Sequence, residues 1–132
     1  MKAIILAAGE GTHLSPFSET RPISMIGVAG RTMLDNTFAL LKSAGINDIF
    51  IVVGHKKDKL IERLQQQDHN VLNLHYVEQK RKLGIGHAVM QVKNKISPGE
   101  YFLLLYGDTL TAENIFSKVQ QSFHSFKCPV AS

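Results

Sequence analysis

The sequence has little of what extracellular and membrane proteins depend on. Cys128 is its single cysteine, so no internal disulfide can form and nothing favours an oxidising compartment. No segment approaches the roughly 18 consecutive apolar residues that a membrane-spanning helix needs. The apolar run near the N-terminus is short and ends in a glycine loop, unlike the longer apolar core of a signal peptide. We therefore expect a cytoplasmic protein with no membrane partner.

The sequence also has only a small excess of charge of one sign. The 15 basic and 11 acidic residues leave a formal net charge of +4. The two short basic clusters, at 56–59 and 80–82, have no interleaved aromatic residues. We interpret them as solvated surface and expect no nucleic-acid partner. A mild positive balance also suits a protein that handles anionic phosphates.

Four apolar segments alternate with helical patterns along the chain. Ala3–Ala8, Asp48–Val53 and Tyr101–Tyr106 have the composition of strands buried on both faces. Val71–Val77 alternates apolar and polar residues and is expected nearer a sheet edge. Apolar spacing predicts helices over 34–44, around 60–64, around 88–92, and after an N-cap at Thr111.

This alternation predicts one α/β domain over residues 1–132 with a mainly parallel sheet. In such sheets ligands bind at the carboxyl ends of the strands. Each predicted strand is followed by glycine, namely Gly9 and Gly11, Gly54, Gly84 and Gly86, and Gly107. We therefore expect these glycines to gather at one edge of the sheet, where a ligand would bind.

The first glycine loop, Leu6–Leu14, is the strongest candidate for a phosphate site. A glycine-rich turn after a buried strand exposes backbone N–H groups that can bind phosphate oxygens. The dinucleotide fingerprint fails, because Leu14 stands where its third glycine belongs and Pro16 follows. A P-loop fails as well, because the glycines at 27–32 have the wrong spacing. We predict a long loop over a nucleotide; the alternative is that the glycines only turn the chain.

A series of motifs resembles those of the sugar-1-phosphate nucleotidyltransferases. Leu6–Pro16 is similar to the family pattern L-A-A-G-x-G-T-R-L-x-P, and 21–25 and 28–34 are similar to x-P-K-x-M and V-x-G-K-P-x-L. The segment 79–88 resembles Q-x-x-x-L-G-T-G-H-A, and Gly107-Asp108 resembles the family's metal-binding G-D. The resemblance extends over nearly the whole chain.

The resemblance implies a fold and a reaction. The fold would be a Rossmann-like three-layer α/β/α sandwich, truncated relative to the family's longer catalytic domain. The reaction would transfer a nucleoside monophosphate from a nucleoside triphosphate to a sugar 1-phosphate, with release of pyrophosphate. Such chemistry depends mainly on positioning and on neutralising the charge that moves to the leaving group.

Site residues also follow from the resemblance. The implied nucleotide-binding positions are Leu6, Ala7, Ala8, Gly9, Gly11, Thr12, Gln79, Gly84 and Gly107. Gln79 and Gly84 would contact the base, and Asp108 would bind Mg²⁺ in the catalytic step. Apart from any family, a carboxylate directly after a buried strand and a glycine is a common ligand of hard cations, although a turn or cap aspartate is the alternative.

Two positions depart from the family pattern where charge matters. His13 stands in place of the arginine that contacts the triphosphate, and Ile23 in place of the lysine near the reacting phosphates. Loss of one charge-stabilising arginine in phosphoryl transfer costs on the order of 10³–10⁵ in rate. Histidine is only partly charged at neutral pH and isoleucine is uncharged, so we expect impaired catalysis.

Three interpretations therefore stay open. The chain is a nucleotidyltransferase that uses Mg²⁺, a nucleoside triphosphate and a sugar 1-phosphate; or a non-catalytic nucleotide-binding or regulatory protein; or one subunit of a split enzyme. An exposed edge on the last strand would favour pairing with a second copy or a partner subunit. Neither the base nor the sugar is set by these residues.

Overall fold

The computed structural model describes residues 1–9, 23–28, 30–54, 56–67, 71–111 and 115–126. The strands are β1 (Lys2–Leu6), β2 (Gly27–Val28), β3 (Arg31–Thr32), β4 (Asp48–Val53), β5 (Asn73–Glu78) and β6 (Phe102–Tyr106). The α-helices are α2 (Met33–Ser43), α3 (Lys57–Gln65), α4 (Ile85–Met90) and α5 (Ile115–Phe126). Two 3-10 helices are η2 (Ile23–Met25) and η3 (Lys93–Lys95).

Four of these strands form one parallel sheet in the order β5-β4-β1-β6. β1 is central, so Ile4 pairs with Phe50 of β4 on one side and with Leu104 of β6 on the other. β2 and β3 form a separate antiparallel pair. The expected parallel sheet is confirmed, and β5 lies at an edge, as its alternating sequence predicts.

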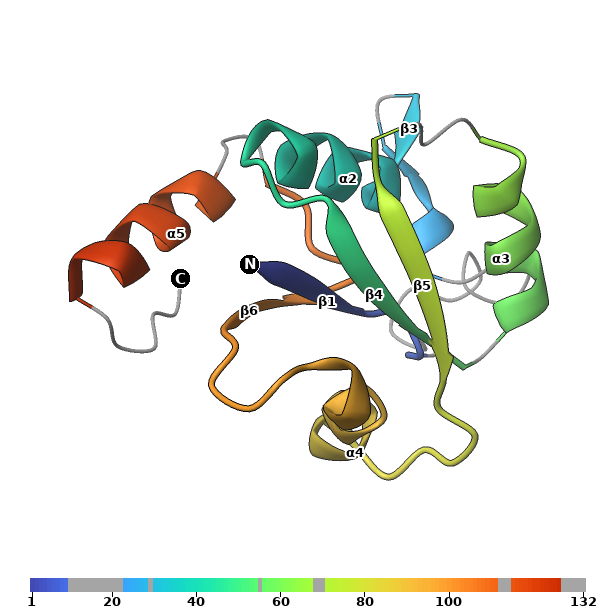
Figure 1. The fold of residues 1–132 in the computed structure, drawn as a ribbon. Helices are drawn as coiled ribbons and strands as arrows, with labels where there is room; N and C mark the ends of the chain where they lie inside the picture. Colours follow the sequence, from blue (N-terminus) through green and yellow to red (C-terminus); the bar gives the residue numbers. More distant parts are fainter. Residues whose placement is uncertain (10–22, 29, 55, 68–70, 112–114, 127–132) are drawn as a thin grey trace.

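Helices cover both faces of the sheet (Figure 1). On one face, Phe38 and Leu41 of α2 and Leu60 and Leu64 of α3 join a buried cluster with side chains of β1 and β4. On the opposite face, Ala88 of α4 packs against the alternate side chains of the same two strands. Because successive strand residues point to opposite faces and both faces are covered, β1 and β4 are apolar after their first residues, Lys2 and Asp48. The expected three-layer α/β/α sandwich is confirmed.

Local signals set both ends of α2. Thr32 Oγ1 accepts a hydrogen bond from the Asp35 N–H, and Asp35 Oδ2 accepts one from the Thr32 N–H, both at 3.1 Å. This reciprocal capping box satisfies two backbone groups that a helix start otherwise leaves without partners. After the helix, Gly45 has a φ of +75° and its N–H donates to Lys42 O at 3.0 Å. The turn into β4 therefore follows the glycine that the sequence marks as the helix end.

β6 differs from the expectation of a strand buried on both faces. Leu105 is buried on the face that α2 covers, whereas Phe102, Leu104 and Tyr106 are 40%, 40% and 49% exposed. These three side chains alternate with Leu105 and lie on the face of α4, which packs over β1 and β4 instead. The expectation fails for this strand because apolar composition does not determine a strand's place in the sheet.

Two smaller points complete the comparison. β1 ends at Leu6, two residues earlier than expected, although Ala7 and Ala8 remain buried. α5 begins at Ile115, and residues 112–114, through which an N-cap at Thr111 would act, lie outside the described residues. Among the helices of the described ranges, none is long and apolar enough to span a bilayer.

Candidate functional site

The chain leaves β1 at the centre of the sheet's carboxyl edge. The Ala7 N–H donates to Val52 O of β4 at 2.9 Å, and the Gly107 N–H donates to Leu6 O at 2.9 Å. Ala7 and Ala8 are buried, and Gly9 is exposed. Both neighbouring strands thus hold the segment as far as Ala8, and the chain reaches solvent at Gly9, within the predicted nucleotide loop Leu6–Leu14.

Two glycines on the flanking strands make this arrangement possible. A Cβ added to Gly54, after β4, would lie 3.0 Å from Ala8 Cβ. A Cβ added to Gly107, after β6, would lie 3.2 Å from both Ala7 Cβ and Leu6 O. Both distances are tighter than ordinary carbon contacts of about 3.5–4.0 Å. Gly107 therefore has a packing reason to be glycine, and its contact with a nucleotide stays a prediction.

β1 and β6 form the switch point of the sheet. From β1 the chain continues to β4 and then β5 on one side, and it returns to β6 on the other side of β1. In open parallel sheets, ligands bind in the crevice outside the carboxyl ends of the strands at such a point. Gly9 and Asp108 follow these two strands closely, so two of the predicted positions flank the switch point.

Gln79 directly follows β5 and is 8% exposed. Its backbone N–H donates to Val53 O at 2.8 Å, which continues the pairing of β5 with β4. Its side-chain Nε2 donates to Gly84 O at 3.2 Å and lies 3.0 Å from His87 Nδ1. The amide thereby closes the connection between β5 and α4, and it brings together the two residues predicted to contact the base.

His87 and Gln91 support this amide, a role that the sequence motif alone did not reveal. In the neutral imidazole tautomer with its hydrogen on Nε2, His87 Nδ1 accepts from Gln79 Nε2. Gln91 Nε2 donates to the His87 backbone oxygen at 3.0 Å, and this bond is how Gln91 holds His87. In this tautomer the 3.2 Å approach of Gln91 Nε2 to His87 Nε2 joins two donors and is no hydrogen bond. The sequence carries one sign of this arrangement: His87 and Gln91 are four residues apart, which places them on one helix face.

Asp108 lies exposed in the turn after β6. The Thr109 N–H donates to Tyr106 O at 3.3 Å, so backbone atoms close this turn without the carboxylate. No hydrogen bond or ion pair joins the Asp108 carboxylate to another residue in the described part of the chain. The alternative of a turn or cap aspartate therefore accounts for the backbone conformation but leaves the side chain without a partner among the described residues.

One ion pair lies beside this edge. Lys57 Nζ at the start of α3 is 2.7 Å from Glu78 Oε1 at the end of β5, and the two side chains are 35% and 38% exposed. Their hydrogen bond lowers the pKa of Glu78 and raises the pKa of Lys57. Solvent screens a pair this exposed, so its main effect is to hold α3 against the end of β5.

Part of the predicted site cannot be placed. Gly11, Thr12 and His13 belong to the segment 10–22, which lies outside the described residues. Ile23 is the first residue of η2, which leads into β2. The predicted roles of these four positions therefore remain expectations from the sequence.

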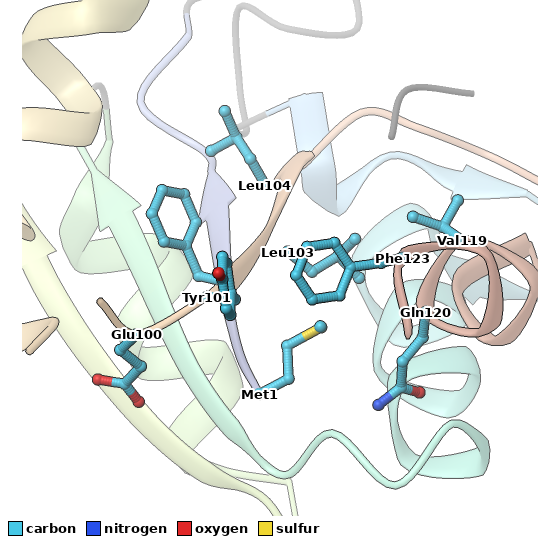
Figure 2. Close-up of a pocket in the computed structure, with 9 residues that line it drawn as sticks. Met1, Glu100, Tyr101, Leu103, Leu104, Val119, Gln120 and Phe123 are labelled. Carbon is cyan, nitrogen blue, oxygen red and sulfur yellow. The ribbon is translucent and has the colours of Figure 1, made fainter. Parts of the chain in front are cut away.

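A hollow of about 330 Å³ lies between β6 and α5 (Figure 2). The Tyr101 and Phe123 rings meet across it with centroids 4.6 Å apart. Figure 2 shows Phe123 pointing from α5 toward Met1 and Leu103. None of the predicted site residues lines this hollow, so it is separate from the carboxyl edge of the sheet.

Comparisons with known proteins agree with this fold and identify its family. Residues 2–127 match the family model described as nucleotidyl transferase. The bifunctional protein GlmU of Methanococcus maripaludis is 38% identical over 115 residues, which are 87% of this chain and 26% of GlmU. The UTP–glucose-1-phosphate uridylyltransferase AglF of Haloferax volcanii is 33% identical over 121 residues, which are 92% of this chain and 49% of AglF.

Solved structures share the fold. A UDP-glucose pyrophosphorylase in complex with UDP-glucose has a TM-score of 0.80 at 21% identity, covering 96% of this chain and 54% of the other. The UDP-glucose pyrophosphorylase of Acinetobacter baumannii has a TM-score of 0.77 at 23% identity, covering 96% and 53%. At these identities the likeness concerns the fold. This chain spans about half of these structures, and between about a quarter and a half of the two curated relatives.

Proposed function

Because the chain belongs to the nucleotidyl transferase family, we propose that it provides the nucleotide-binding half of a sugar-1-phosphate nucleotidyltransferase site. The proposed reaction transfers a nucleoside monophosphate from a nucleoside triphosphate to a sugar 1-phosphate and releases pyrophosphate. The observation that carries the proposal is the carboxyl edge of the sheet. There the buried end of β1 fits against Gly54 and Gly107, with Gln79 on one flank and Asp108 on the other.

The proposed roles follow the position of each residue along this edge. Ala8 and Gly9, continued by Gly11 and Thr12, would bind the ribose and phosphates through backbone N–H groups. Leu6 and Ala7 would position them, because the Ala7 N–H already donates to Val52 O. The nitrogen of the Gln79 amide is bonded to Gly84 O and faces His87, which directs the amide oxygen elsewhere. That oxygen is a suitable acceptor for an N–H of a base, and Gly84 would lie beside the base.

Asp108 would hold Mg²⁺ together with phosphate oxygens. Among the described residues, no three His, Cys, Asp or Glu side chains gather closely enough to hold a metal ion. This donor set still fits Mg²⁺, which commonly binds through one or two carboxylates and completes its shell with substrate phosphates and water. Bound there, Mg²⁺ would neutralise charge on the triphosphate, and Asp108 would position the ion at the switch point.

We propose that the chain retains nucleotide binding but that its catalytic turnover is impaired. The backbone N–H groups of the loop are independent of side-chain identity, whereas His13 and Ile23 replace the two cations that the family pattern places near the reacting phosphates. We therefore expect nucleotide binding that depends on Mg²⁺, with slow or absent turnover by this chain alone. A non-catalytic nucleotide-binding protein is the limiting case of the same proposal.

A second candidate function is that of a half-site, which a second polypeptide chain completes. The outer edge of β6 has no strand partner among the described residues, and three of its large side chains are exposed. An open edge with apolar side chains favours pairing with another strand. We propose a second copy of this chain as the first occupant to test, and a separate partner subunit as the second.

Calorimetric titration with UTP, dTTP and GTP, with and without Mg²⁺, tests the binding part. Asp108→Asn should weaken Mg²⁺-dependent binding by about tenfold or more, because a carboxylate ligand is lost. Asp48→Asn is the matched control, since Asp48 begins β4 at the opposite end of the sheet and bonds Asn73 there. Equal binding of every nucleotide by wild type and Asp108→Asn would contradict the proposed metal position.

A pyrophosphate-release assay across sugar 1-phosphates separates the remaining candidates. Turnover by a monomeric chain would exclude both the non-catalytic protein and the half-site. Turnover that appears only above a concentration at which light scattering shows a dimer would support completion by a second copy. The double change His13→Arg and Ile23→Lys should raise nucleotide affinity in the presence of Mg²⁺; an unchanged affinity would contradict the placement of these two positions.

A further inference from the structure

We propose that a basic pocket between the β2–β3 pair and α3 binds a small phosphate-bearing anion, separately from the nucleotide edge. The pocket has a volume of about 410 Å³. The argument uses six of its lining residues, which are Gly27, Gly30, Arg31, Thr32, Lys59 and Arg63. Among the described residues that line it, three side chains are cations and none is a carboxylate.

The three cations come from two elements that the fold brings together. Arg31 lies in β3, opposite Val28 of β2, and Lys59 and Arg63 lie on α3. Residues four apart share one face of a helix, so Lys59 and Arg63 are neighbours, and like charges at this spacing repel each other. With Arg31 at the same hollow, positive charge accumulates in a small volume. A multiply charged anion is the ligand that such an arrangement attracts.

The donor types and the volume define the ligand class. Two guanidinium groups each present a planar fork that matches two phosphate oxygens. Gly27 and Gly30 have no side chains, so the backbone on their side of the pocket is open to a ligand. The space beside Gly30 is empty, since an added Cβ there would meet nothing within 4 Å. Thr32 Oγ1 already accepts from the Asp35 N–H, so the arginines would carry recognition. Two forks and this volume suit pyrophosphate or a sugar phosphate better than a single small ion.

The pocket is distinct from the carboxyl edge but connected to it through α3. None of its lining residues belongs to the predicted nucleotide site, and Figure 1 shows β3 and α3 beside α2, which covers the same face of the sheet as α3. Lys57, the first residue of α3, donates its N–H to Gly54 O at 3.2 Å and pairs with Glu78 beside Gln79. An anion that holds α3 against the β2–β3 pair would therefore act on the segment that packs against Ala8.

The test measures two ligands on the same variants. Titration with pyrophosphate in the absence of Mg²⁺ should show one saturable site in wild type, and Arg31→Gln and Arg63→Gln should each weaken it by about tenfold or more. Lys59→Gln and Lys93→Gln form a matched pair, because both remove one lysine charge but Lys93 lies in η3, outside the pocket. We expect Lys59→Gln to weaken pyrophosphate binding and Lys93→Gln to leave it unchanged. UTP affinity should be unchanged in all four variants.

Several outcomes would overturn the inference. No saturable pyrophosphate binding in wild type would remove its basis. Displacement of pyrophosphate by UTP in a one-to-one competition would place the anion at the nucleotide edge instead. An equal loss in Lys59→Gln and Lys93→Gln, or equal affinity for sulfate and pyrophosphate, would show diffuse attraction by net charge. Glucose 1-phosphate, titrated in parallel, identifies the source: tighter binding than pyrophosphate supports a sugar phosphate, and weaker binding supports pyrophosphate itself.

Discussion

Gly54, which follows β4, lies so close to Ala8, which follows β1, that a methyl group added at Gly54 would strike Ala8. A Cβ on Gly54 would lie 3.0 Å from Ala8 Cβ and 3.3 Å from Ala8 O. Carbon atoms pack best at about 3.5–4.0 Å, so Gly54→Ala must displace the segment that ends β1. Overpacking of this kind costs about 1–3 kcal/mol of unfolding free energy, and we expect Gly54→Ala to lie in that range. UTP binding should weaken as well, because Ala8 leads directly into the nucleotide loop.

A second substitution separates this contact from other effects of the first. Ala8→Gly removes the atom that the new methyl group would strike. Alone it should destabilise the fold, by about 0.8 kcal/mol for the lost buried carbon and about 0.5–1 kcal/mol for added chain entropy. In the double variant the contact at 3.0 Å is gone, and those at 3.3 Å and 3.4 Å remain. The two changes should therefore compensate each other by about 1 kcal/mol, as neighbouring residues do in double-mutant cycles.

Urea unfolding of the four proteins measures the cycle, with UTP calorimetry on the same samples. A lower midpoint at constant slope reports a change in stability. Gly86→Ala is the control, because an added Cβ there meets nothing within 4 Å and Gly86 is inside α4. It should be neutral or stabilising by up to about 1 kcal/mol. An unchanged midpoint in Gly54→Ala, or strict additivity in the double variant, would refute the packing explanation of Gly54.

Two further predictions concern the caps and charges around the same edge. Thr32→Ala breaks the capping box of α2 and should lower the unfolding free energy by about 1 kcal/mol, whereas Thr32→Ser keeps the acceptor and most of the stability; urea midpoints of both variants decide this. The hydrogen bond from Lys57 lowers the pKa of Glu78 from its ordinary 4.5, so the folded state binds this proton less readily than the unfolded state does. That contribution is present above the ordinary pKa and is lost as the pH falls through the lowered value. Glu78→Gln should therefore flatten the loss of stability below about pH 4.5. If the urea midpoints of wild type and Glu78→Gln fall by equal amounts as the pH is lowered, the Lys57–Glu78 pair contributes nothing to stability.

The sequence predicts best those parts of the fold that local chemistry determines. Asp48–Val53 forms a strand over its predicted bounds, because its apolar run suits a strand with both faces covered. The end of α2 before Gly45 follows from the freedom of glycine at positive φ. The glycines after β1, β4 and β6 lie at one edge, because parallel strands must have their carboxyl ends together.

The remaining features depend on relations between distant residues. β6 has the composition of a central strand, but strand order places it at an edge and leaves Leu104 exposed. The bond from Gln79 to Gly84 and the support from His87 require the path of the connection between β5 and α4, which no periodicity encodes. Likewise, the spacing of Lys59 and Arg63 is visible in the sequence, but the pocket that they share with Arg31 is not.

The central place of β1 also has a consequence for the order of events during synthesis. Lys2 pairs with Phe102, so β1 receives its second neighbour only after 100 further residues have been made. At about 5–20 residues per second, that interval is on the order of 5–20 s. During this time β1 has at most β4 on one edge, and its other edge lacks β6. The nascent chain therefore presents an open, aggregation-prone edge on β1 until β6 emerges, and the sheet closes around β1 only at that point.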